Sequence, residues 1–273
     1  MKNKFKNYIG FWSLLIVAFL VFGVMSAFEP LSFNGHELKS SKIWPTLTAH
    51  HADTLVIDKK RHAYLDSVAN IEETVAVVKP AEVDTVPQTI LFIGDSMLDG
   101  LYPRLAAYAD ENGHTLYVVI WYSSTSEVWG KSDKLQKYIT QFNPTYIFVS
   151  LGANELFVKD IAEKRDKYVK KILSDIGDIP YVWIGPPNWK PDTGINDLVE
   201  GNAGEEHFFL TNGMKFNRKK DGAHPTHESA IGWMDSVVRW MPEHAAHPIR
   251  LDIPNQKTAR AKRVFIHQPD EKP

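Results

Sequence analysis

The chain has 273 residues, enough for one full-sized domain with additional segments at its ends. Hydrophobic residues (44%) and charged residues (23%) occur in the proportions of a globular protein with a substantial core, and a formal net charge of −2 at pH 7 does not favour nucleic-acid binding. The chain has no cysteine, which excludes a disulfide scaffold, a thiol nucleophile, a zinc ribbon and a cysteine-linked lipid anchor.

The N-terminal segment combines lysines with a long uncharged run. Lysines at positions 2, 4 and 6 precede Tyr8–Phe28, which contains no charged side chain. About 20 helical residues at 1.5 Å each span the ~30 Å hydrocarbon core of a bilayer. Residues 1–28 are therefore predicted to form a transmembrane anchor of the inner (cytoplasmic) membrane, or else a cleaved signal peptide, because Val24–Ala27 offers small residues for cleavage. Lysines on the amino side predict that the rest of the chain is periplasmic.

Residues 29–87 have a mixed composition interrupted by prolines. We expect a membrane-proximal linker with one or two short helices, around Arg61–Ile71. His50 and His51 have no further ligand at helical spacing, so we interpret them as solvated loop residues rather than a metal site.

Between residues 88 and 242, short apolar strands alternate with amphipathic helices. The run Thr89–Ile93 is continuously apolar and rich in β-branched residues, which is typical of a buried parallel strand. The helix predicted at Met97–Asn112 carries leucines on one stripe and ends before Gly113, a common left-handed cap. The remaining predicted elements are a strand at Thr115–Ile120, a helix at Ser132–Phe142, a strand at Tyr146–Leu151, a helix at Val158–Ile176, strands at Pro180–Ile184 and Glu206–Leu210, and a helix at Thr226–Trp240.

This alternation predicts a flavodoxin-like, three-layer α/β/α domain with a parallel sheet over residues 88–242. Residues 243–273 lose the periodicity, and we expect a C-terminal tail. Its cationic stretch Lys257–Arg263 is either a solvated surface or a contact with anionic lipid headgroups or a partner. Functional side chains on such sheets lie just past the carboxyl ends of the strands.

Three polar clusters fall at those positions: Gly94–Ser96, Gly152–Glu155 and Asp221–His224. Each has an ordinary structural interpretation by itself, as a helix cap or a tight turn. Together they supply a hydroxyl nucleophile, an amide donor and an acid–base pair at one edge of the predicted sheet. This combination favours chemistry over a purely structural role.

The ordered set resembles the SGNH (GDSL-like) hydrolase superfamily. Gly94-Asp95-Ser96 matches its serine block, Gly152-Ala153-Asn154-Glu155 its asparagine block, and Asp221-Gly222-Ala223-His224 its final block. The resemblance covers about residues 88–240. It implies an acyl-transfer enzyme that needs neither a metal nor another cofactor.

The resemblance implies Ser96 as the nucleophile, His224 as the base and Asp221 as the acid that orients it. A serine hydroxyl is a weak nucleophile until a base takes its proton, and a carboxylate fixes the imidazole tautomer. The Ser96 backbone N–H and the Asn154 amide are the expected oxyanion donors. Ser124 stands where the family has an oxyanion-hole glycine; a serine still has a backbone N–H, but it adds a side chain where glycine allows close approach.

Aromatic residues near the predicted strand ends suggest a surface that stacks on a sugar, with core packing as the alternative. We take Asp95, Trp121, Trp129 and Trp189 as candidate substrate-binding residues.

The expected function is therefore a serine-dependent ester hydrolase that acts on O-acyl (acetyl) esters of an extracytoplasmic glycan through an acyl-enzyme. If a sugar hydroxyl replaces water, the protein is instead an O-acetyltransferase of a cell-envelope polysaccharide, working with a membrane-bound acyltransferase partner. A catalytically inactive glycan-binding module is the third alternative, which the intact set of triad residues disfavours. The expected partners are an acylated glycan or another small ester, and not nucleic acid.

Overall fold

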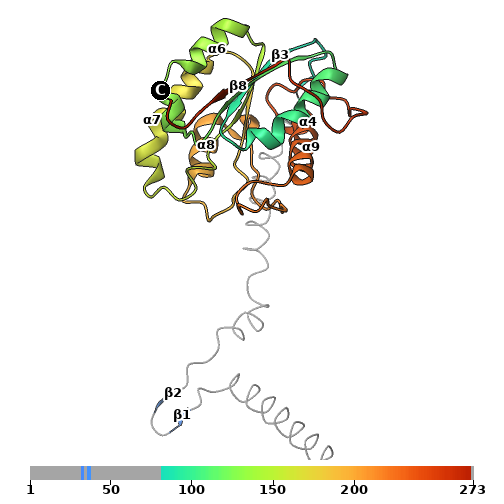
Figure 1. Ribbon diagram of the computed structural model, residues 1–273. Helices are drawn as coiled ribbons and strands as arrows, with labels where there is room; N and C mark the ends of the chain where they lie inside the picture. The colour runs from blue at the N-terminus through green and yellow to red at the C-terminus, as the bar shows by residue number, and fades with distance from the viewer. Residues whose placement is uncertain (1–31, 34–35, 38–80, 272–273) are drawn as a thin grey trace, which may run out of the picture. The chain divides into compact units, whose positions relative to one another are not determined.

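The computed structural model describes residues 32–33, 36–37 and 81–271 (Figure 1). The chain divides into two compact units, residues 1–78 and 79–273. In the first unit, β1 (Ser32–Phe33) pairs antiparallel with β2 (His36–Glu37). The predicted anchor at residues 1–28 and the predicted linker helix near residue 65 lie outside the described residues. Within the described part, no helix has the length and apolar character needed to cross a membrane.

The second unit is built on a six-stranded sheet in which every neighbouring pair is parallel. Its strands are β3 (Thr89–Gly94), β4 (Thr115–Trp121), β5 (Tyr146–Ser150), β6 (Tyr181–Ile184), β7 (Phe208–Phe209) and β8 (Arg263–His267). They lie in the order β7-β6-β5-β3-β4-β8. The first five strands along the chain thus follow the 2-1-3-4-5 order of flavodoxin-like sheets. The chain reverses its direction of winding between β3 and β5, and ligands of such sheets bind at this point.

Helices cover both faces of the sheet, which gives three layers (Figure 1). One face carries α4 (Leu98–Glu111) and α9 (His227–His244), and the other carries α5 (Ser126–Gly130), α6 (Lys134–Phe142), α7 (Ile161–Ile176) and α8 (Ile195–Ala203). A short 3-10 helix, η1 (Glu205–His207), precedes β7. Alternate residues of β3 enter separate cores, Ile90 on the α4 side and Leu91 on the α7 side. Because both faces are buried, the central strands have apolar residues at every position.

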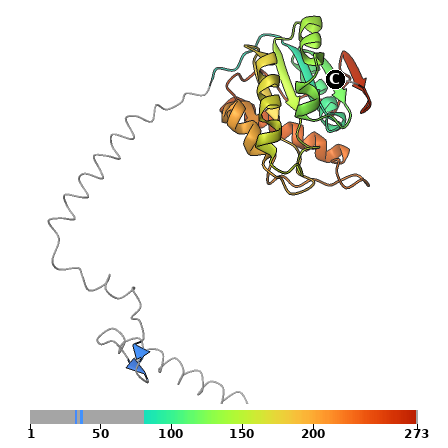
Figure 2. The same ribbon diagram turned by 90° about the vertical axis from the view of Figure 1, so that its left-hand side faces the viewer.

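The structure confirms the predicted three-layer α/β class with a parallel sheet, but the expected C-terminal tail was wrong. Residues 263–267 form β8, which pairs with β4 from Tyr117 to Trp121 and lies at the edge of the sheet, in red in Figure 2. The segment before β8 is also held, because the carbonyl groups of Gln256 and Lys257 accept hydrogen bonds from Arg104. An edge strand buries only part of its surface, so β8 lacks the continuous apolar run of the central strands.

Two helices were also missed, α5 and α8. The start of α8 depends on a local hydrogen-bond pattern rather than on hydrophobic periodicity. The Asp192 carboxylate accepts the backbone N–H groups of Gly194, Ile195 and Asn196, which compensates the free N–H groups at the start of the helix.

Candidate active site

Ser96 lies in the turn between β3 and α4, where Gly94 allows an unusually close approach of β3 to β5. A Cβ atom on residue 94 would lie 2.2 Å from the carbonyl oxygen of Ser150, so any other residue would push the strands apart. The Asp95 N–H donates to that same carbonyl at 3.1 Å, and the Asp95 side chain accepts the Met97 N–H at 2.9 Å. These bonds fix the turn and leave Ser96 half-buried at the surface of the sheet edge.

The Asp221–His224 loop places an imidazole against the Ser96 hydroxyl. His224 Nε2 lies 2.8 Å from Ser96 Oγ, although the two residues are 128 positions apart. On the other side of the ring, His224 Nδ1 lies 3.0 Å from Asp221 Oδ2. The three predicted triad residues therefore form one continuous chain of hydrogen bonds.

The electrostatics of Asp221 suit this arrangement. Its Oδ1 atom accepts the backbone N–H groups of His224 at 2.9 Å and Ala223 at 2.8 Å. These two bonds, the His224 N–H first, lower the pKa of Asp221 to about 2. Asp221 therefore remains a carboxylate at neutral pH and accepts the Nδ1 proton of His224, which leaves Nε2 free to accept the proton of Ser96.

Asn154 lies beside the Ser96 turn, in the loop after β5. That loop turns at Gly152, whose φ of +119° is rarely adopted by residues with a side chain. The Asn154 amide donates to the Ser124 carbonyl at 3.0 Å, and its nitrogen lies 3.4 Å from an oxygen of Asp95. One amide hydrogen is thus held firmly by the Ser124 carbonyl, and the other is donated over a longer distance to Asp95 Oδ2.

The structure gives Ser124 a different part from the one expected for an oxyanion donor. Its N–H donates within the turn to the Trp121 carbonyl at 3.1 Å, and its hydroxyl accepts the Trp129 indole N–H at 3.0 Å. Ser124 is almost completely buried. It contributes to the site through its carbonyl, which holds Asn154, rather than through its N–H.

Three of the four candidate substrate-binding residues are buried, so that interpretation of them was wrong. Trp121 and Trp129 are 1% and 0% exposed and pack edge to face with ring centroids 5.6 Å apart, so neither ring is free to stack on a sugar. Asp95 is likewise buried. Trp189 is different: it is partly exposed, and its indole N–H donates to the Ala153 carbonyl at 2.9 Å, next to Asn154.

Burial also changes the ionisation of Asp95. The loss of solvation is the largest effect and raises the pKa of Asp95 to about 7, with a smaller contribution from the negative charge of Glu155. Hydrogen bonds from the backbone N–H groups of Met97 and Ala153 oppose this rise. A substantial fraction of the Asp95 carboxyl groups is therefore uncharged at neutral pH.

Glu155 was not assigned a role from the sequence, yet it ties the Asn154 loop to the helices around it. Its fully buried carboxylate accepts the N–H of Ser126 at 2.8 Å, the hydroxyl of Ser126 at 2.7 Å and Nε of Arg165 at 2.8 Å. Glu155 thereby connects the end of β5 to α5 and α7. A glutamate that is buried needs hydrogen-bond or ion-pair partners, but only the fold identifies which residues provide them for Glu155.

Arg218 was also missed, and it supports the loop that carries His224. Its guanidinium donates to the Ala223 carbonyl at 2.5 Å and to the Asn188 carbonyl at 3.0 Å. The backbone around it runs antiparallel to the His224 loop, with a bridge between Arg218 and Pro225. The His224 loop is thus held against the chain that precedes Trp189.

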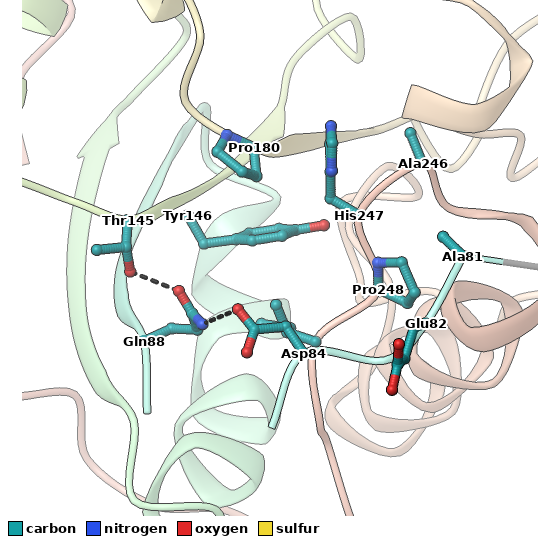
Figure 3. Close-up of a pocket in the computed structure, with 11 residues that line it drawn as sticks. Ala81, Glu82, Asp84, Gln88, Thr145, Tyr146, Pro180, Ala246, His247 and Pro248 are labelled. Atoms are coloured by element: carbon teal, nitrogen blue, oxygen red, sulfur yellow. Dashed lines mark hydrogen bonds between the residues drawn. The ribbon is translucent and has the colours of Figure 1, made fainter. Parts of the chain in front are cut away.

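A separate pocket of about 220 Å³ lies at the opposite end of the sheet (Figure 3). There Gln88 connects Asp84 to Thr145, and the phenol oxygen of Tyr146 points towards His247. This pocket is next to the amino ends of β3 and β5, whereas Ser96 and Asn154 follow the carboxyl ends of the same strands. It is therefore no part of the Ser96 site. The described residues contain no group of three or more His, Asp or Glu side chains placed to hold a metal ion.

Comparisons with known proteins give similarity only at the level of structure. No protein-family model and no curated protein matches the chain. A psychrotrophic esterase, EstA from Pseudoalteromonas sp., solved with monoethylphosphonate as inhibitor, is 17% identical with a TM-score of 0.40, covering 56% of this chain and 98% of the esterase. A gut microbial diltiazem-metabolizing enzyme is 13% identical with a TM-score of 0.38; the match covers 60% of this chain but only 48% of that enzyme.

Proposed function

We propose that this protein is a serine esterase of the SGNH type with Ser96, His224 and Asp221 as its catalytic triad. The observation that carries the proposal is the hydrogen-bond chain from Asp221 Oδ2 to His224 Nδ1 and from His224 Nε2 to Ser96 Oγ, at 3.0 and 2.8 Å. These hydrogen bonds lie where the sheet changes its direction of winding, which is the usual ligand-binding position of the fold. Their geometry is that of a nucleophile, a base and an orienting acid.

In the proposed reaction, His224 takes the Ser96 proton while Ser96 Oγ forms a bond to the carbonyl carbon of the ester. The carbonyl oxygen becomes an oxyanion. The tetrahedral intermediate then collapses, the bond to the alcohol oxygen breaks, and His224 gives its proton to that oxygen. Water next attacks the acyl-enzyme with His224 again as the base, which releases the carboxylic acid and restores Ser96. Asp221 remains ionised throughout and stabilises the imidazolium form of His224.

Two groups are available to stabilise the oxyanion. Among the hydrogen bonds of residues 81–271, the Ser96 N–H donates to no protein acceptor. The Asn154 amide is anchored by one hydrogen to the Ser124 carbonyl at 3.0 Å, and its second hydrogen makes only a long contact of 3.4 Å with Asp95 Oδ2, which it would exchange for the oxyanion. The fraction of molecules in which Asp95 is protonated has no full negative charge beside this amide, close to the developing oxyanion.

We further propose that the ester is an O-acyl group on an extracytoplasmic glycan. The uncharged run Tyr8–Phe28 behind a lysine-rich start supports a membrane anchor with this domain on the outer side. The partly exposed Trp189 beside Asn154 supports a substrate with an apolar ring face.

Turnover of a chromogenic acetyl ester by the full-length protein tests the enzyme assignment. Ser96→Ala is expected to lower kcat by about 10³-fold or more, because no other hydroxyl takes the place of Ser96. Ser174→Ala, at an exposed serine on α7, is the control and should retain the rate. Equal turnover by Ser96→Ala and the unmodified protein, or none by either, contradicts the proposal. Turnover that requires an added glycan acceptor supports acyl transfer instead of hydrolysis.

A further inference from the structure

A cationic segment lies directly beside the proposed base. Residues 215–220 contain four cations in six positions, Lys215, Arg218, Lys219 and Lys220. The Lys219 N–H donates to the His224 carbonyl at 2.8 Å, and on the other side of the bridge the Thr226 N–H donates to the Asn217 carbonyl at 2.8 Å. Backbone hydrogen bonds therefore hold this segment alongside the His224 loop.

The positive charge of this segment exceeds the negative charge of the carboxylate beside it. Lys215, Lys219 and Lys220 are exposed, and none of them takes part in an ion pair among the described residues. Asp221 adjoins them and contributes one negative charge against four positive ones, so the positive charges remain in excess. Since the whole chain has a net charge of −2, this excess of positive charge is local.

An exposed aromatic pair lies on the side of the site formed by the Asn154 loop. Phe157 is 53% exposed, and its ring packs edge to face with Trp189 at a centroid distance of 6.2 Å. Lys190 Nζ lies 4.6 Å from the Trp189 centroid and 5.2 Å from that of Phe157. Lys190 is exposed and also makes no ion pair among residues 81–271. Large exposed aromatic rings beside a site indicate a ligand-binding surface more strongly than an exposed small apolar residue does.

The aromatic pair and the cationic segment belong to one continuous rim. Arg218 donates to the Asn188 carbonyl, and the next residue, Trp189, donates to the Ala153 carbonyl. The chain at residues 188–190 thus connects the loop of His224 to the loop of Asn154. A molecule bound along this rim would reach both the cations and the aromatic rings while an acyl group lay at Ser96.

We infer that the rim binds an anionic saccharide chain, with carboxylate, phosphate or sulfate groups on Lys190, Lys219 and Lys220 and a sugar ring face on Phe157 and Trp189. This inference rests on the proposed function and specifies its substrate class. A neutral glycan would leave three lysines beside the site without counter-charges, whereas an anionic one gains attraction that salt screens.

Competition with a small neutral ester tests the inference in the full-length protein. Polygalacturonate is expected to inhibit hydrolysis of para-nitrophenyl acetate at low ionic strength and much less at high ionic strength, while neutral dextran has little effect. In the combined variant Lys190→Gln, Lys219→Gln and Lys220→Gln, the inhibition constant should rise about tenfold, as expected for the loss of three exposed charge pairs. Each inhibition constant is determined from rates divided by the uninhibited rate of the same variant.

The matched control removes three exposed lysines that lie elsewhere. Lys137→Gln, Lys167→Gln and Lys262→Gln together change the net charge equally and should leave the inhibition constant within about twofold. Equal inhibition by dextran and polygalacturonate, or an equal effect of the two triple variants, overturns the inference. If small-ester turnover is present while these preferences are absent, only the inference fails; if no ester is turned over, the proposed function fails with it.

The aromatic part of the rim has its own probe. Phe157→Ala should raise the inhibition constant for polygalacturonate severalfold and leave that for inorganic polyphosphate unchanged, because polyphosphate has charge but no sugar ring. An equal effect on both polymers would show that Phe157 does not contact a sugar.

Discussion

The buried carboxyl group of Asp95 gives the protein a specific dependence of stability on pH. Burial raises the pKa of Asp95 from its ordinary value of 3.8 to about 7 in the folded chain. Between these values the folded state binds a proton that the unfolded state has released, so the free energy of unfolding falls as the pH rises from about 4 to 7. A pKa difference of about 3 corresponds to about 4 kcal/mol across that range.

Asp95→Asn tests this reasoning, because asparagine keeps an oxygen for the Met97 N–H but carries no charge at either pH. The free energy of unfolding of the full-length protein would be measured by urea denaturation at about pH 5 and pH 8. The free energy of unfolding of the variant, relative to that of the unmodified protein, should be about 3 kcal/mol higher at pH 8 than at pH 5. The contributions of the other titrating groups are the same in both proteins, so they cancel when the two free energies of unfolding are subtracted. Asp178→Asn, the same substitution at an exposed position, supplies the control. A difference that is the same at both pH values would refute the role of burial.

Three further outcomes follow from the site. Asn154→Ala should lower kcat by about 10²–10³-fold with little change in KM, measured with a small acetyl ester, and an unchanged kcat would remove Asn154 from the oxyanion site. Glu155→Ala should lower the free energy of unfolding by about 3–5 kcal/mol, because it leaves the buried N–H and hydroxyl of Ser126 and the Nε of Arg165 without their acceptor, while Glu163→Ala on the surface of α7 should stay within about 0.5 kcal/mol. Arg218→Met should lower kcat about tenfold or more through displacement of His224, and a loss confined to stability would argue against that positioning role.

Local patterns in the sequence were sufficient to predict the central strands and most of the helices. The run Thr89–Ile93 is apolar on both faces because β3 lies in the middle of the sheet, and that property is visible without a structure. The edge strand β8 buries less surface, and α8 begins with a carboxylate that accepts several N–H groups, so neither leaves a strong periodic signal. β8 was therefore missed because its burial is partial, and α8 because its start depends on a local hydrogen-bond pattern.

For the site, the sequence by itself determined the residue types and their order: a serine after the first strand of the sheet, an amide after β5, and an Asp–His pair before α9. These follow from chemistry that needs particular side chains at the carboxyl ends of strands. Only the tertiary structure decided which residues meet. It brings His224 to Ser96 across 128 positions, buries Trp121 and Trp129 within the core, and uses the Ser124 N–H inside a turn. Burial and hydrogen-bond partners depend on the packing of segments distant in the chain, so no local pattern reveals them.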